Sequence, residues 1–319
     1  MSISRRIIAV TAFLILVFAV IPILIAVSGR KDFYYTLSSV ALLSMASAGV
    51  WLTFHIGRIN IGQGAYALMG GYVSAILVMS YGVSFWWTLP LAGLFCALAS
   101  ILIGLPILRL RGVYFAMVTL VLTEVARLLA LALPVTQGAK GITSIPVEVF
   151  GLTLVPDFTM MENPRIAFYY LSVALMTACF ALMHRLVNSR IGHICMSLQQ
   201  NEELASSIGI NIAQIRVIAY AISSFLGGLA GAVFVAATQS VYPSSFTVAD
   251  SINFMLNCFL GGLGYVFGPM LGTLVLYFGW NLLFETGRFQ LLIYSALMIA
   301  LMLVLPNGLL SLGTLRKER

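Results

Sequence analysis

Apolar runs long enough to cross a lipid bilayer follow one another along almost the whole chain. A transmembrane helix needs about 20 mostly apolar residues, because the hydrocarbon core is about 30 Å thick. Hydrophobic residues make up 61% of the 319 residues and charged residues 8%, a composition that a water-soluble core does not accommodate. We therefore expect an all-α polytopic membrane protein. Its predicted spans cover residues 7–27, 34–54, 61–80, 85–108, 113–133, 167–184, 213–238, 251–264, 269–286 and 289–306.

The stretch from Ser251 to Thr286 is the least regular of these runs, being too long for one crossing and short for two. Gly261-Gly262-Leu263-Gly264 and Gly268-Pro269 interrupt it near the middle. Such interruptions are expected where short helices meet at a turn. Two crossings and a re-entrant pair both remain open at this point.

The distribution of basic residues tests the number of crossings, because Lys and Arg concentrate on the cytosolic side. Ten crossings with a cytosolic N-terminus leave eleven basic residues inside and five outside, whereas a single crossing over 251–286 gives nine against seven. We therefore predict about ten transmembrane helices with both termini in the cytosol. The inner residues are then Arg5, Arg6, Arg58, Arg109, Arg111, Arg185, Arg190, Arg216, Arg316, Lys317 and Arg319, and the outer ones Arg30, Lys31, Lys140, Arg165 and Arg288.

The polar segment 185–216 lies in the cytosol in this topology, between spans six and seven. Within it, Asn201 is a plausible N-cap, Glu202 and Glu203 occupy a first turn where the helix dipole favours negative charge, and Gly209 can end a helix. The pattern predicts a short capped helix, which is suited to docking. A solvated connector without a further role is the alternative.

The remaining connections suggest one transmembrane domain over residues 1–319. Residues 1–33 form the first span and a short outer loop, and residues 134–166 form a long outer loop rich in Gly and Pro. That loop is either a passive cap or a seat for an external partner. The four cysteines suggest packing residues rather than a disulfide framework. They are Cys96, Cys179, Cys195 and Cys258.

Several polar side chains are predicted to lie at membrane depth. Glu124 and Arg127 are three residues apart on one helix face, so we interpret them as a structural pair. Asp250, Asn253 and Asn257 give one span a polar face, which must look into the protein or into water. Asn281 and Glu285 form a similar pair near an outer end. The candidates for a translocation path are Gln63, Tyr66, Asn253 and Asn257.

The chain lacks the sequence signatures of enzymes that bind nucleotides or metals. It has no Walker loop, dinucleotide fingerprint, His-Glu-x-x-His or Gly-x-Ser-x-Gly element, and its three histidines have no metal-ligand spacing. We therefore expect a transport protein without a cofactor, a metal site or a nucleic-acid partner of its own. The energy for active transport would come from an ion gradient or from another subunit.

Four short sequence motifs follow one another along the chain, and their order and spacing are informative. They are Arg109-Leu110-Arg111-Gly112 followed by Glu124 and Arg127; Gln137 to Ile142; Ser189-Arg190-Ile191-Gly192 followed by Asn201-Glu202 and Gly209-Ile210-Asn211; and Gly261-Gly262-Leu263-Gly264 with Gly268-Pro269. From about Trp51 to Leu310 the chain resembles the Liv-type branched-chain amino acid permeases of ATP-binding-cassette importers.

This resemblance implies a role for the polar segment in transmitting motion from an ATPase subunit. The implied partners are a related second permease, two ATPase subunits that bind ATP and magnesium, and an external binding protein, at the inner membrane of a prokaryote. Similar permeases for urea, short amides or sugars are alternatives, as is a self-contained carrier or channel. The residues implied in ATPase coupling are Arg190, Gly192, Asn201, Glu202, Glu203, Ala205, Ser206 and Gly209.

The polar segment also departs from the family pattern. Gln199 and Gln200 stand where relatives usually have a basic and an acidic residue, and Leu204-Ala205 stands where they usually have two alanines. The segment is therefore less charged than is typical of the family.

Overall fold

The computed structural model describes residues 32–149, 152–153, 164–207, 209–283, 287, 289–305 and 308–311, and it is almost entirely helical over them. Strands β1 (Glu148–Val149) and β2 (Leu152–Thr153) form a minimal antiparallel hairpin. The predicted first span at 7–27, Glu285 and the basic tail 316–319 lie outside the described residues. Among the described residues, six helices are long and apolar enough to cross a membrane. They are α3 (Asp32–Phe54), α4 (Gln63–Tyr81), α5 (Phe85–Ile107), α6 (Val113–Ala132), α7 (Pro164–Val187) and α10 (Ile212–Thr238).

Helices α11 (Val248–Gly261), α12 (Gly268–Leu282) and α13 (Gln290–Val304) are shorter than a helix that crosses a bilayer usually is. Helix α11 has 14 residues, while α12 and α13 have 15 each. At a rise of about 1.5 Å per residue they extend roughly 21–22 Å, less than the hydrocarbon thickness. A polytopic helical fold is thus confirmed. The described residues contain six helices of spanning length, together with α11, α12 and α13 in the regions of the last three predicted spans.

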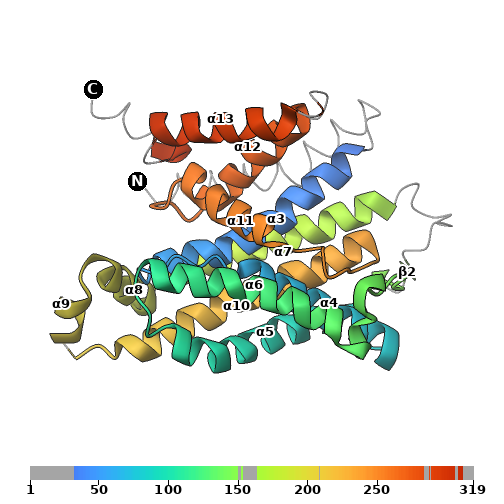
Figure 1. The fold of residues 1–319 in the computed structure, drawn as a ribbon, viewed down its shortest axis with the longest axis horizontal. Coiled ribbons are helices and arrows are strands. Elements are labelled where there is room, and N and C mark those ends of the chain that lie inside the picture. The colour runs from blue at the N-terminus through green and yellow to red at the C-terminus, as the bar shows by residue number, and fades with distance from the viewer. Residues whose placement is uncertain are drawn as a thin grey trace, which may run out of the picture.

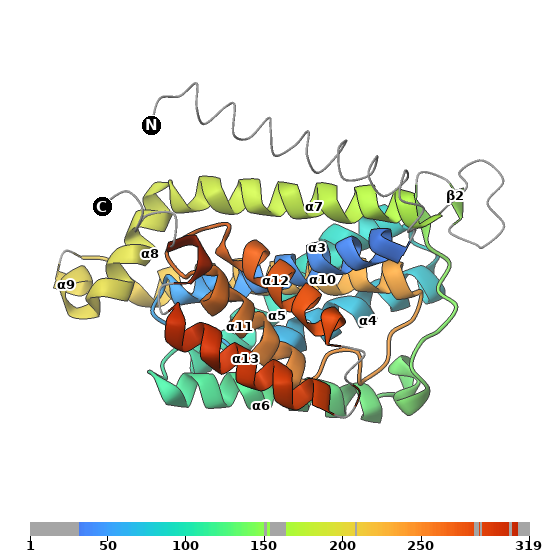
Figure 2. The same cartoon turned by 90° about the horizontal axis from the view of Figure 1, so that it is seen from above.

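Helix α10 lies at the centre of the bundle and packs against α3, α4 and α5. Its backbone approaches α4 so closely that a Cβ on Gly70 would lie 2.2 Å from the Gly228 oxygen, and one on Gly231 would lie 1.9 Å from the Ala67 oxygen. These distances leave no room for side chains, so the glycines of α4 serve helix packing, as the sequence suggests. Figure 1 shows α12 and α13 on one side of the bundle and α5 on the other, and Figure 2 shows α7 along one flank and α6 along the opposite one.

Helices α11 and α12 form a tight antiparallel hairpin beside α3. A Cβ on Gly261 would lie 1.7 Å from the Gly268 oxygen, and Gly262 takes a positive φ of 109° at the end of α11. Trp51 Nε1, near one end of α3, donates a hydrogen bond to the turn at the Leu263 oxygen (2.8 Å). Phe33, at the other end of α3, packs against Phe278 of α12. The predicted break near Gly261–Pro269 is confirmed, and the hairpin extends along most of α3.

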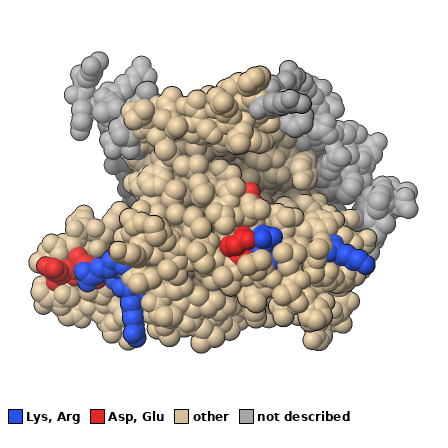
Figure 3. All heavy atoms as spheres, viewed as in Figure 1, with Lys and Arg blue, Asp and Glu red and all other residues tan. Residues whose placement is uncertain are grey.

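Most charged side chains on the face shown in Figure 3 gather at one end of the molecule, around the two short helices α8 (Arg190–Gln200) and α9 (Glu202–Ser207). We call this the α9 end. An oppositely charged pair lies over the middle of the same face. Glu124 and Arg127, interpreted above as a structural pair, are in contact: Arg127 Nε donates to both Glu124 oxygens at 3.1 and 3.0 Å.

Candidate functional site

The polar segment between α7 and α10 folds into two short helices, of which sequence reasoning anticipated only the second. Ser189 caps α8 by accepting a hydrogen bond from the Gly192 N–H (3.5 Å). A Cβ on Gly192 would lie 2.2 Å from the Val187 oxygen, so only glycine lets α8 turn this tightly off the end of α7. Arg190, in contrast, is exposed. Buried Gly192, Cys195 and Leu198 show the helical spacing that could have identified α8.

Helix α9 has the caps that its sequence predicts. The Asn201 side chain accepts a hydrogen bond from the Leu204 N–H at 3.0 Å, and Gly209 takes a positive φ of 85° just beyond the helix. Asn211 then caps α10 by accepting from the Gln214 N–H at 3.2 Å. Both ends of α9 are therefore fixed by local hydrogen bonds and backbone geometry.

Glu202 joins α9 to three other parts of the chain. Arg216 of α10 forms a bidentate pair with it, at 2.9 Å from Nη1 to Oε1 and 2.7 Å from Nη2 to Oε2. Arg111, between α5 and α6, lies 3.3 Å away. Arg58, just after α3, lies 4.0 Å away, too far for a hydrogen bond but close enough for an ion pair. One carboxylate thus connects α9 to three separate elements.

The electrostatics of this cluster favour the ionised carboxylate. Hydrogen bonds from Arg216, with the charges of all three arginines, hold the pKa of Glu202 below its ordinary value. Burial lowers the pKa of Arg58, and the nearby positive charge of Arg216 lowers it further. The Arg58 and Arg216 side chains are only 6% and 7% exposed. Removing the carboxylate would leave these two buried cations together without compensation, which is costly.

The outward face of α9 differs from the face that packs on this chain. Ala205 is 2% exposed and lies against the protein, whereas Glu203, Ser206 and Ser207 are exposed. Leu204 is 65% exposed and adds an apolar side chain to this outward face. The surface open to another protein is therefore Glu203, Leu204, Ser206 and Ser207, and Glu202 and Ala205 hold the helix in place.

A second feature is a cavity of about 700 Å³ between α11, α12 and α13. Figure 3 shows a hollow between the α13 layer and the body of the bundle, with an acidic side chain visible inside it. Asp250, Asn253 and Asn257 of α11 line this cavity, so the polar face predicted from their spacing does look into a hollow. Asn257 also donates from Nδ2 to Ser47 Oγ of α3 at 3.0 Å. Around them, the walls carry mostly aliphatic and aromatic residues, including Leu43, Ile252, Phe254, Leu276 and Met298.

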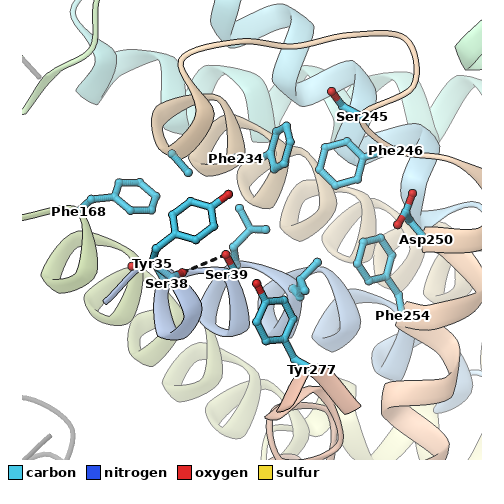
Figure 4. Close-up of a pocket in the computed structure, with 13 residues that line it drawn as sticks. Tyr35, Ser38, Ser39, Phe168, Phe234, Ser245, Phe246, Asp250, Phe254 and Tyr277 are labelled. Atoms are coloured by element: carbon cyan, nitrogen blue, oxygen red, sulfur yellow. Dashed lines mark hydrogen bonds between the residues drawn. The ribbon is translucent and has the colours of Figure 1, made fainter. Parts of the chain in front are cut away.

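A smaller cavity of about 210 Å³ adjoins the first one. Figure 4 shows Tyr35 and Ser39 of α3, Asp250 and Phe254 of α11 and Tyr277 of α12 around it. The two cavities have four residues in common, namely Leu43, Asp250, Phe254 and Tyr277. These residues form a shared wall in which Asp250 is the charged member.

The other two translocation-path candidates lie elsewhere. Gln63 is fully buried between α4 and α10, where its Nε2 donates to the Ser223 oxygen (3.0 Å). Tyr66 is also fully buried and donates from its hydroxyl to Tyr220 of α10 at 3.1 Å. Neither residue lines the two cavities described above. Their polar groups fasten α4 to α10 instead.

Comparison with known proteins identifies the family. Residues 33–306 match the family model described as branched-chain amino acid transport system / permease component. The chain belongs to this permease family. The resemblance seen in the sequence is thereby confirmed.

Several curated relatives carry related descriptions. The chain is 35% identical over 272 residues to the high-affinity branched-chain amino acid transport system permease protein LivM of Escherichia coli, and equally to that of Salmonella typhimurium, covering 80% of this chain. It spans 64% of the length of these two relatives. It is 24% identical over 272 residues to the LivH permease protein of Salmonella typhimurium, covering 80% of this chain and 86% of LivH. No solved structure matches the chain.

The glycine-rich loop after α6 lies against the segment that leads into α11. Ile142 and Val241 exchange backbone hydrogen bonds of 2.9 and 2.8 Å. A Cβ on Gly141 would lie 2.4 Å from the Val241 oxygen, and Gly141 has a positive φ of 63°. A side chain at this position would therefore separate this loop from the α10–α11 connection.

Proposed function

We propose that this chain is a permease subunit of an ATP-driven importer for branched-chain or related aliphatic amino acids in a prokaryotic inner membrane. Its α8–α9 segment receives the motion of an ATPase subunit. The observation that supports this role most strongly is the contact of Glu202 with Arg58, Arg111 and Arg216. A force on α9 reaches three parts of the chain through one side chain, as a coupling element requires.

The topology in this proposal has ten crossings and two cytosolic termini. The extent of the α11–α12 hairpin along α3 supports two crossings over this region, although each helix is short. The α9 end then faces the cytosol and residues 134–149 face outside. The concentration of charged residues at the α9 end agrees with the cytosolic excess of basic residues.

The partners in this proposal are a second, LivH-like permease, two ATPase subunits and an external binding protein. Salmonella typhimurium has proteins named as LivM and LivH permeases of the same type of transport system. This chain is similar to both but more similar to LivM, which supports pairing with a LivH-like subunit. ATP and magnesium would be bound by the ATPase subunits, so this chain needs no cofactor.

The substrate path in this proposal follows the cavity along α11, with Asn253 and Asn257 in its wall. An aliphatic amino acid has a charged end and an apolar end, and the cavity has one polar stripe among apolar walls. Gln63 and Tyr66 have a packing role in this scheme. A self-contained carrier would instead have no need for a docking face on α9.

Cysteine labelling tests the docking face directly. All four native cysteines are buried, so an introduced cysteine on α9 would be the main accessible thiol among the described residues. We expect Ser206→Cys to react with a membrane-impermeant maleimide from the cytosolic side and to cross-link to the ATPase subunit in the assembled transporter.

Tyr81→Cys provides the matched control. Tyr81 is 74% exposed and is the last residue of α4, at the end of that helix that we expect to face outside. It should react from the outside and form no cross-link to the ATPase subunit. Labelling of Ser206→Cys from the outside would overturn the topology, and the absence of a cross-link in a transporter that is active would overturn the docking role.

A further inference from the structure

Asp250 occupies a distinctive position in the wall shared by the two cavities. Among the described residues that line either cavity, it is the single charged side chain. A carboxylate at membrane depth is costly unless it is paired, hydrated or used by a ligand. The surrounding groups in Figure 4 are hydroxyls and aromatic rings, including Tyr35, Tyr277 and Phe254, and these do not neutralise its charge.

The local fold uses only one of the two carboxylate oxygens. Asp250 Oδ2 accepts hydrogen bonds from the Thr247 N–H (2.8 Å) and the Thr247 hydroxyl (2.7 Å), which complete a capping box at the start of α11. Within the described part of the chain, Oδ1 accepts no hydrogen bond. A helix cap needs a hydrogen-bond acceptor at this position, but it does not need a full negative charge.

We propose that Asp250 binds the ammonium group of the amino acid as it passes through this cavity, an inference that rests on the proposed function. An α-ammonium group offers three hydrogen-bond donors and a positive charge. Asp250 Oδ1 can accept such a hydrogen bond, and the negative charge of the carboxylate can pair with the ammonium. Leu43 and Phe254 lie in the same wall and provide an apolar surface for an aliphatic side chain. Asp250 would thereby favour amino acids over uncharged solutes of similar size.

Two variants separate the charge of Asp250 from its role as a helix cap. Asp250→Asn removes the charge and keeps an oxygen that can accept from Thr247. Thr247→Val removes the hydroxyl and keeps the charge. Both are measured in proteoliposomes that contain the complete transporter, with radiolabelled leucine and the binding protein. The amount of assembled transporter is determined for each variant, so that uptake is expressed per complex.

We expect Asp250→Asn to lower leucine uptake per assembled complex by about tenfold to a hundredfold, the range for a lost charge-assisted contact. ATP hydrolysis stimulated by the loaded binding protein should persist. Thr247→Val should lower the melting temperature and keep uptake per complex within about twofold. Replacing sodium by choline should leave wild-type uptake unchanged, because the bound cation is the amino acid itself.

Leucine uptake by Asp250→Asn at the wild-type level would overturn the ammonium site and leave the proposed function intact. A wild-type complex that takes up no leucine would overturn both the ammonium site and the proposed function. Failure of Asp250→Asn to assemble, or an equal loss of uptake per complex in both variants, would show that Asp250 has a structural role only. Sodium dependence that disappears in Asp250→Asn would assign the site to an inorganic cation and also overturn the proposal.

Discussion

At the residue scale, two adjacent glutamates of α9 have different surroundings. Glu202 contacts three arginines of its own chain, whereas Glu203 is exposed. Because the arginines lower the pKa of Glu202, its contribution to stability is present at neutral pH and is lost only as pH falls through that lowered pKa.

Glu202→Gln should uncouple α9 from the spans at neutral pH. The variant leaves Arg58 and Arg216 buried without their carboxylate. We expect this to lower the free energy of unfolding by about 2–3 kcal/mol, because the partial exposure of Glu202 reduces the full cost of a buried unpaired charge. We expect leucine uptake by the assembled transporter to fall at least about tenfold while ATP hydrolysis continues. Glu203→Gln is the matched control and should retain uptake within about twofold. Equal uptake by the two variants would contradict the coupling role of Glu202.

The sequence predicted these residues unequally well. Asn201 and Gly209 were identifiable because caps depend on local backbone geometry. The grouping of Arg58, Arg111 and Arg216 around Glu202 depends on tertiary packing, which spacing along the chain does not reveal. For the same reason, the polar character of Gln63 and Tyr66 indicated that they face inward, but not whether they face a cavity or a neighbouring helix.

At the element scale, the α11–α12 hairpin depends on backbone contact that only glycine permits. A Cβ on Gly272 would lie 1.9 Å from the Asn257 oxygen, whereas one on Gly279 of the same helix would have no neighbour within 4 Å. The Gly-Gly-x-Gly and Gly-Pro pattern predicted the turn, and the spacing of Asp250, Asn253 and Asn257 predicted the polar face. The pattern could not predict how closely α12 packs on that face.

Gly272→Ala should separate α11 from α12. We expect the free energy of unfolding to fall by about 1–3 kcal/mol, because the new methyl group meets main-chain atoms that cannot rotate away. The readout is the thermal unfolding of the purified complex in detergent. Gly279→Ala should be neutral or slightly stabilising, because alanine favours the helix and meets open space. A similar decrease in melting temperature for both variants would refute the close-packing explanation.

At the scale of the whole molecule, the question is whether this chain moves solute by itself. The family match, together with the docking role proposed for α9, favours an assembly in which ATP hydrolysis occurs in another subunit. We expect the isolated chain in liposomes to take up no leucine down a concentration or ion gradient, and the assembled transporter to take it up only with ATP inside. Gradient-driven uptake by the isolated chain would instead indicate a self-contained carrier.

Helix α10 gives this assembly a continuous mechanical link. Arg216, near its start, contacts Glu202, and the Gln239 oxygen just past its end accepts from the Ile145 N–H at 3.1 Å. Its 27 residues form a rod of roughly 40 Å. If α10 moves as a rigid helix in the proposed transport cycle, a tilt at the α9 end would also shift the loop that contains Ile145. The outer surface offered to a binding protein would then report the state of the ATPase on the other side of the membrane.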